Sequence, residues 1–382
     1  MHYSFEIRSF LNLISPFPQA LVLILACGLS ILIVSEKALA QDTIRTYHVE
    51  NPTRVKEIFT KINGKANGEV RLFDLDGNLV QIGQLKDDQR HGTFVDLDPE
   101  TGDTVRVMQF VTNNRQGKSI SYFPGGAISQ ESYFENNQLE GLVTSYFENG
   151  KISKKSTFQN NKPNGLTETF FPDGNTESKI NFSAGQFDGV SEYFAQNGQL
   201  IRKVTYSKGI LNGPELAYFE NGQLQSRRTY KNGQLDGEYL GYYENGSPER
   251  KGIYKKGLPE GEMIEYFPDQ SIRMKALYRK GIPIAPTVYF YENGQPRLQL
   301  TFNEYGEKIL EEGFYLSGKA FSRINFENER EEGVANYYHE NGQLKEIRTY
   351  LKGRLNGKRE LFDENGKLLE TEFYENGNKI NN

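Results

Sequence analysis

A glycine recurs every 24 residues along most of this 382-residue chain, which constrains its fold more than any other feature. Gln270 occupies the one interrupted position of this first glycine column. The column consists of Gly126, Gly150, Gly174, Gly198, Gly222, Gly246, Gly294, Gly318, Gly342 and Gly366. Self-similarity at a fixed period of this size is typical of repeat arrays, in which each unit packs on its neighbours.

Two further columns keep the same period. A second glycine column runs nine residues before the first, and a late aromatic column runs eight residues after it. The second glycine column includes Gly141, Gly165, Gly189, Gly213, Gly237, Gly261, Gly333 and Gly357, and the late aromatic column includes Phe158, Phe182, Tyr206, Tyr230, Tyr254 and Tyr278. The repeat fills nearly everything after Ala40, so we expect one elongated domain that buries aromatic stripes layer by layer.

Each unit is predicted to be a β-hairpin. Asn221-Gly222 lies between two runs of β-compatible residues, and a two-residue Asn-Gly loop is a strong hairpin signal because both positions need positive φ. The equivalent structural turns are expected at Gly150, Gly174, Gly198, Gly222, Gly246, Gly294, Gly342 and Gly366. A second turn, around Asn232-Gly233, joins successive hairpins. The predicted fold class is therefore all-β, an elongated array of stacked antiparallel hairpins.

The two-residue loop predicts a register. It places Phe147 opposite Ile152 and Phe219 opposite Leu224, and it places each late aromatic opposite the second-column glycine of its own hairpin. An aromatic ring that covers a cross-strand glycine protects bare backbone.

The other face of the sheet is predicted to be charged and striped with rings, because neighbouring strand residues point to opposite faces. The candidate binding surface on this striped face is the row Tyr146, Phe170, Phe194, Tyr218, Tyr242, Tyr266 and Phe290. Beside it runs a basic column of Lys155, Lys179, Lys203, Arg227, Lys251 and Lys275, in which Glu168 faces Lys179 and Glu192 faces Lys203. The alternative is a sheet that rolls or pairs and buries these rings.

Units such as Tyr230 to Gly237, followed by Tyr242 to Gly246, resemble the MORN repeat variant of bacterial repeat proteins, many of which are catalogued as antitoxin-family proteins. The resemblance covers roughly residues 62–377, about thirteen units at this period. It implies an extended sheet of hairpins used in protein association, membrane attachment or scaffolding, with no catalytic residues to carry over.

The N-terminus predicts export. Residues 20–34 form an apolar run that is short for a membrane span, and Ala38-Leu39-Ala40 follows it as an A-x-A cleavage site. We therefore divide the chain into a signal peptide or signal anchor (1–40), a lead-in or cap (41–61) and the repeat array (62–382). Cleavage after Ala40 predicts a periplasmic or extracellular protein, and an uncleaved segment predicts one anchored in the inner membrane.

Composition argues against several functions. The net charge of −5 and the lack of a basic run do not fit nucleic acid or an anionic membrane surface as partner. The four histidines are widely separated and the one cysteine lies in the leader, so no metal, cofactor or catalytic site is expected.

The repeat is irregular between Pro268 and Glu332, where Gln270, Ala285 and Ile309 replace column glycines. This segment is interpreted either as repeat decay or a bend, or as a partner-specific patch. We expect an exported, non-enzymatic protein that binds a protein partner or acts as a scaffold. The alternatives are a neutralising antitoxin or immunity protein and a binder of cell-wall or surface glycans.

Overall fold

The computed structural model describes residues 41–380, so the predicted signal or anchor segment lies outside the described residues. These residues form one antiparallel sheet of 33 strands, and they contain no helix. The predicted all-β hairpin array is confirmed. The first half of the sheet consists of β1 (Gln41–Tyr47), β2 (Val55–Ile62), β3 (Lys65–Phe73), β4 (Leu79–Lys86), β5 (Gln89–Arg90), β6 (Gly92–Leu97), β7 (Thr104–Val111), β8 (Asn114–Arg115), β9 (Gly117–Tyr122), β10 (Ile128–Glu135), β11 (Gln138–Tyr146), β12 (Ile152–Gln159), β13 (Lys162–Phe170), β14 (Thr176–Ser183), β15 (Gln186–Phe194) and β16 (Leu200–Ser207). The second half consists of β17 (Ile210–Tyr218), β18 (Leu224–Lys231), β19 (Gln234–Tyr242), β20 (Pro248–Lys255), β21 (Leu258–Tyr266), β22 (Ile272–Arg279), β23 (Ile282–Pro283), β24 (Thr287–Phe290), β25 (Pro296–Phe302), β26 (Lys308–Phe314), β27 (Ala320–Glu327), β28 (Arg330–Glu331), β29 (Gly333–Tyr338), β30 (Leu344–Leu351), β31 (Arg354–Phe362), β32 (Leu368–Glu375) and β33 (Asn378–Ile380).

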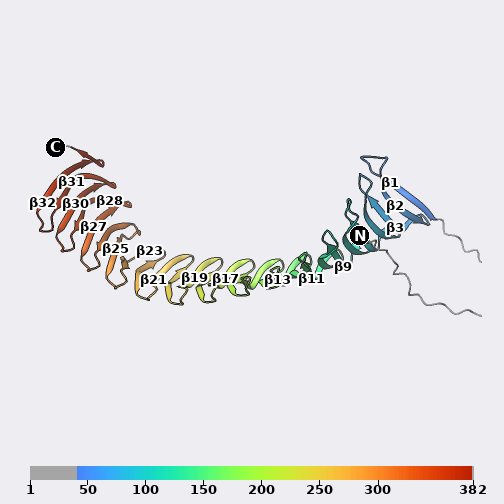
Figure 1. Cartoon of the computed structure of the whole chain (residues 1–382), viewed down its shortest axis with the longest axis horizontal. Coiled ribbons are helices and arrows are strands. Elements are labelled where there is room, and N and C mark those ends of the chain that lie inside the picture. Colours follow the sequence, from blue (N-terminus) through green and yellow to red (C-terminus); the bar gives the residue numbers. More distant parts are fainter. Residues whose placement is uncertain (1–40, 381–382) are drawn as a thin grey trace, which may run out of the picture. The chain divides into compact units, whose positions relative to one another are not determined.

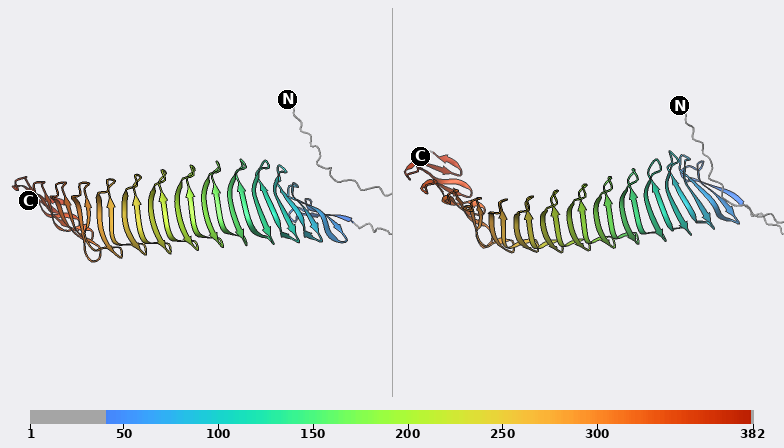
Figure 2. Two further views of the ribbon diagram at one scale, coloured as in Figure 1. Left: turned by 90° about the horizontal axis from the view of Figure 1, so that it is seen from below. Right: turned by 60° about the horizontal axis from the view of Figure 1, so that its bottom comes forward.

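Strands pair with their neighbours in the chain, so the sheet grows hairpin by hairpin (Figure 1, Figure 2). The two-residue strands β5, β8, β23 and β28 each pair with the strand before them, and after each one the chain pairs with that same strand again. The lead-in 41–61 joins the same sheet, because β1 pairs with β2 and β2 with β3. Within residues 41–380 the sheet is a single open layer.

The Asn-Gly turn differs from the prediction. Gly222 has a φ of 86° while Asn221 is outside the positive-φ region, and the N–H of Phe219 donates to the carbonyl oxygen of Gln223 at 2.9 Å. The loop therefore has three residues and ends in a glycine bulge, where a two-residue type I′ turn was expected. Asn221 instead uses its side chain, which accepts the N–H of Gln223 at 2.9 Å and donates to the carbonyl of Glu244 in the next hairpin at 3.3 Å.

The extra loop residue shifts the register next to the turn. Leu224 lies opposite Tyr218, and Ile152 lies opposite Tyr146, so the predicted pairing of these two residues with Phe219 and Phe147 is wrong. The shift ends within one residue of the turn, and the predicted pairing of Gly213 with Tyr230 is confirmed.

The type I′ turn lies at the other end of the hairpin. Asn232 and Gly233 have φ values of 50° and 80°, and Lys231 pairs directly with Gln234. The second-column Gly237 follows with a φ of 133°, in the stretch where the pairing of β18 and β19 is interrupted. Each repeat therefore uses two different turns. The strands after the type I′ turn, such as β17, have nine residues against eight in β18, and they contain the irregular stretch around the second-column glycine.

Side chains also link successive repeats. In the residues just after the first strand of several hairpins, a ring donates a hydrogen bond to a backbone carbonyl one repeat later. The hydroxyl of Tyr243 donates to Tyr266 at 2.7 Å, and that of Tyr315 donates to Tyr338 at the same distance. His339 Nε2 lies 3.0 Å from the carbonyl oxygen of Phe362. These bonds stabilise the sheet across the turn edge, where no strand pairing is available.

The most deeply buried positions along most of the array carry small side chains. Ser156, Ser191 and Val204 are no more than 2% exposed, and all three lie on one face, which we call the small-residue face. Rings of successive hairpins flank them: Phe187 lies 5.0 Å from Phe182 and 5.2 Å from Tyr206 between ring centres. The late aromatics from Phe158 to Tyr278 are only half-buried, so the prediction that the chain buries aromatic stripes is wrong for this part of the array.

A compact apolar core exists only near the start of the described chain, where Val70, Phe94, Met108 and Phe110 are buried together. Phe94 packs flat against the backbone, since a Cβ built on Gly83 would lie 2.2 Å from its ring. This position therefore requires glycine.

We predict that Gly222→Val lowers the free energy of unfolding by about 2 kcal/mol, because a β-branched residue at positive φ is strained. Gln223→Ala is the control, since Gln223 is exposed and is not among the residues with positive φ. Urea unfolding of both variants checks this, and equal midpoints would contradict the turn geometry.

Candidate binding surface

The predicted ring row occupies equivalent places in seven successive hairpins. Each ring is the last residue of β11, β13, β15, β17, β19, β21 or β24, and each is half-buried. Equivalent residues are separated by two strand spacings, about 10 Å. The row is thus a periodic set of partly exposed rings.

The striped face carries the rings away from the buried columns. In β17, Tyr218 and Leu216 alternate with Ala217 and the buried Glu215, and Glu215 pairs with Val204 of the small-residue face. The late aromatics, such as Tyr230, lie on the small-residue face with Arg228. The rings of the striped face are therefore not used to cover second-column glycines.

Tyr146 differs from the other rings of the row because it has a polar partner. Its hydroxyl donates to Glu131 at 3.0 Å, and Lys118 lies 2.7 Å from the same carboxylate. The hydrogen bond from Lys118, together with that from Tyr146, lowers the pKa of Glu131, while burial and the nearby carboxylate raise the pKa of Tyr146. This ring contributes to local stability as well as to the surface.

The predicted charge pairs on the striped face are confirmed by register. Glu168 lies between Lys155 and Lys179, and Glu192 lies between Lys179 and Lys203. The Nζ atom of Lys203 is 2.8 Å from Glu192, and this hydrogen bond raises the pKa of Lys203. Charges of both signs therefore alternate across β12 to β16.

Buried carboxylates on the small-residue face were not anticipated from the sequence. Glu215, with a side chain 9% exposed, lies 2.8 Å from Arg202 and 3.8 Å from Arg228. Glu265 is held in the same way between two arginines. Each lies in a repeat column whose other members vary from serine, alanine or glycine to tyrosine, and only the structure shows that arginines from both neighbouring strands reach it. Such paired carboxylates stabilise the sheet.

The C-terminal hairpins extend this pattern into a network. Arg359 lies 2.6 Å from both Glu346 and Glu372, and Lys379 forms a second ion pair with Glu372 at 2.5 Å. The hydrogen bonds from Lys379, Arg359 and Tyr374 lower the pKa of Glu372 to about 2.

The irregular segment changes the hairpin geometry. β24 has four residues, and its pairing with β25 ends at Thr287 opposite Leu300. The next turn is another three-residue loop ending in Gly306, so no type I′ turn occurs there and β25 and β26 both have seven residues. Ile309 can replace glycine because its backbone is ordinary strand. Gln270 keeps the usual turn with a φ of 71°.

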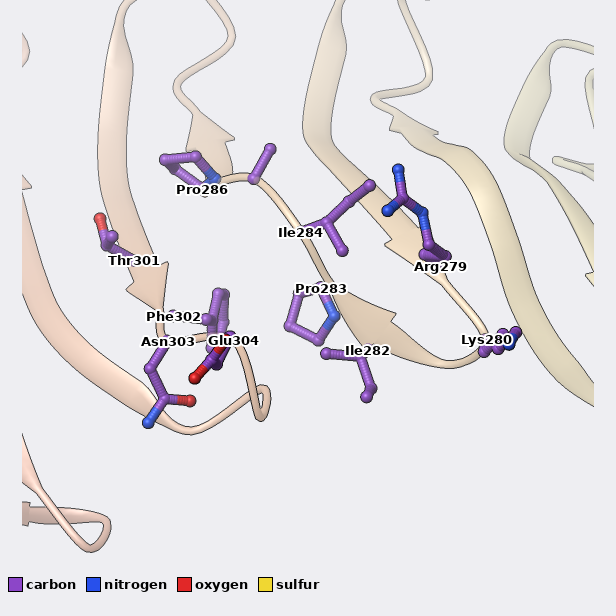
Figure 3. Close-up of a pocket in the computed structure, with 11 residues that line it drawn as sticks. Arg279, Lys280, Ile282, Pro283, Ile284, Pro286, Thr301, Phe302, Asn303 and Glu304 are labelled. Atoms are coloured by element: carbon purple, nitrogen blue, oxygen red, sulfur yellow. The ribbon is translucent and has the colours of Figure 1, made fainter.

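A cavity of about 640 Å³ opens where this pairing is lost (Figure 3). It lies between the segment 282–286 and the segment 301–304. The side chains of Ile282, Pro283, Ile284, Pro286 and Phe302 form apolar walls, and Arg279 and Lys280 lie at one end. A second hollow of about 610 Å³ includes Phe290, the last ring of the predicted row. The irregular segment is thus a structural break that creates concave surface.

In residues 41–380 no three His, Cys, Asp or Glu side chains are grouped so that they could hold a metal ion. None of these residues belongs to a helix long and apolar enough to cross a membrane.

Comparison with known families identifies the repeat. The MORN repeat variant matches residues 139–160, 187–208, 211–232, 235–256, 331–352 and 355–376. The chain therefore carries MORN repeat variants at these six positions, as the sequence pattern indicated. No curated protein matches the chain.

Among solved structures, the chain is similar to the Photorhabdus luminescens Tc holotoxin pore, with 12% identity, 86% of this chain and 23% of that chain covered, and a TM-score of 0.16. A TcdB2-TccC3 crystal structure matches with 13% identity over 86% of this chain and 20% of that chain, with a TM-score of 0.15. The chain thus spans less than a quarter of these chains, and scores this low carry no argument about function.

The Glu372 network predicts a pH dependence. The pKa of Glu372 is lowered from 4.5 to about 2. The contribution of its carboxylate to the stability of the fold is therefore complete above about pH 4.5 and is lost as the pH falls toward 2. The protection of β32 and β33 amides against hydrogen exchange, taken relative to the intrinsic exchange rate at each pH, should therefore fall over this window.

Glu372→Gln should exchange faster already at neutral pH and show a flatter profile. Glu370→Gln is the matched control, because Glu370 is 53% exposed and lies 3.9 Å from Lys379. Identical pH profiles for the two variants would contradict the assignment.

Proposed function

We propose that this chain is an exported, non-enzymatic repeat protein that binds a protein partner through the striped face. The observation that supports this most directly is the position of the ring row. The rings are half-exposed, recur in seven successive hairpins and lie on the face that the small buried residues do not use.

Rings at fixed intervals on a continuous sheet are suited to protein recognition. Aromatic side chains are enriched at protein interfaces because they bury large areas while losing little conformational entropy. Repeat arrays use extended surfaces of this kind for binding. A partner that spans several hairpins would contact several rings at once, and such a surface also fits a scaffold.

Changing Tyr218, Tyr242 and Tyr266 together to Ser should reduce partner capture at least tenfold while leaving urea unfolding nearly unchanged. Tyr146 is left unchanged because its hydroxyl binds Glu131. Pull-down from an envelope extract with quantitative mass spectrometry measures capture.

Changing Tyr206, Tyr230 and Tyr254 to Ser is the matched control on the small-residue face. This variant should unfold at lower urea but keep capture per folded molecule. Unchanged capture in the first variant would reject the striped face. If the first variant instead lost its retention on cell-wall glycan while its capture of protein was unchanged, the glycan binder would be favoured.

Export with cleavage of the leader would leave a defined N-terminus. N-terminal sequencing of the mature protein should begin at Gln41, because the A-x-A sequence ends at Ala40. An intact N-terminus in the membrane fraction would contradict cleavage and favour the anchored form.

A further inference from the structure

One column of the striped face changes its chemistry part-way along the sheet. From β12 to β16 it alternates lysine and glutamate, as described above. From β17 onward the acidic positions become aliphatic: Leu216 lies opposite Arg227, and Leu240 lies between Arg227 and Lys251. Ile264 then lies between Lys251 and Lys275. The cations continue, but the carboxylates that balanced them do not.

We call Leu216, Arg227, Leu240, Lys251, Ile264 and Lys275 the basic-aliphatic strip. Arg227 and Lys251 are exposed and Lys275 is half-buried. Within residues 41–380, no ion pair of 4.0 Å or less involves these three cations. Their charges are therefore available to a partner.

The strip is flanked by tyrosine rings on one side and by carboxylates and exposed aliphatic side chains on the other. Tyr218, Tyr242 and Tyr266 lie on the same face, two residues further along their strands. On the other side are the carboxylates Glu238 and Glu262, opposite Ile253 and Leu277. Ile253 and Leu277 are 52% and 38% exposed, so apolar surface is exposed next to the cations.

The cations repeat every second strand, which corresponds to about 10 Å. A polyproline II segment advances about 3.1 Å per residue and has three residues per turn, so every third side chain points the same way at about 9 Å intervals. Surfaces lined with aromatic rings are the usual docking sites for such segments. The two periods match closely over three hairpins.

We propose that the basic-aliphatic strip and its three tyrosines bind an extended acidic polypeptide segment in which a carboxylate recurs at every third residue. Each carboxylate meets one of Arg227, Lys251 and Lys275, and the residues between them pack on the tyrosines and aliphatics. The proposal rests on the striped face as the binding surface and adds the chemistry of the partner. An acidic chain with a local cationic strip is selective, because the rest of its surface repels the same ligand.

The test uses the complete exported protein and a fluorescent peptide of about five Glu-Pro-Pro units. Anisotropy at low ionic strength should show saturable binding that weakens as salt is added. Changing Arg227, Lys251 and Lys275 together to Gln should weaken binding about tenfold, the size expected for three exposed ion pairs.

The matched control changes Lys155, Lys179 and Lys203 together to Gln. It removes the same charge from the same face, but in the part where Glu168 and Glu192 already balance it. Its affinity should change by less than about threefold. Equal losses in the two triple variants would overturn the proposal.

Two further ligands test the chemistry. A Lys-Pro-Pro peptide should not bind. A peptide of the same composition with all its glutamates adjacent should bind at least threefold more weakly than Glu-Pro-Pro. Equal affinity for the clustered peptide, or for inorganic polyphosphate, would overturn the assignment of a spaced acidic polypeptide.

The peptide assay and the tyrosine variant together distinguish a wrong ligand from a wrong binding face. If the acidic peptide does not bind while the tyrosine variant still loses its cellular partner, the acidic segment is wrong and the striped face stands. If the peptide binds through the three cations while the tyrosine variant keeps its cellular partner, the cellular interface lies elsewhere and the proposed function is wrong.

Discussion

The structure depends on backbone conformations that favour glycine or asparagine. A single open sheet has no second layer to hold it, so each hairpin must connect to the next with the correct register. Three positive-φ sites per repeat do this: the bulge glycine of the three-residue loop, the type I′ turn and the second-column glycine, as at Gly222, Gly233 and Gly237. Because a one-residue slip would exchange the faces, these turns also determine which side chains point outward.

The separation of faces gives the two sides different roles. On one face, serines, valines and buried carboxylates lie low beneath flanking rings, and arginines balance the carboxylates. On the other face, rings and charges protrude at regular intervals. Stability is thereby concentrated on the small-residue face, and the striped face is left for recognition.

The irregular segment shows that the two turns are interchangeable. Between β24 and β27 every connection is a three-residue loop, the strands shorten to seven residues in β25 and β26, and the period of the array is kept. The break removes backbone pairing over two residues and opens the cavity beside Phe302. The segment in which the glycine pattern is lost is thus also the segment in which the surface becomes concave.

The sequence by itself determined the all-β repeat, the place of both turns, the pairing of late aromatics with glycines, and the face on which the tyrosine row lies. These follow from local backbone preference and the two-residue alternation of strands. Only the tertiary structure decided the loop length, because Asn221 and Asn232 both precede a glycine in the sequence, yet Asn221 has an ordinary φ and Asn232 a positive one. It also decided that small residues, not rings, are the most buried along most of the array beyond the core around Phe94, and that Arg227, Lys251 and Lys275 face aliphatic neighbours. Burial and cross-strand contacts depend on residues one hairpin away, and their register is set only when the loops and bulges are formed.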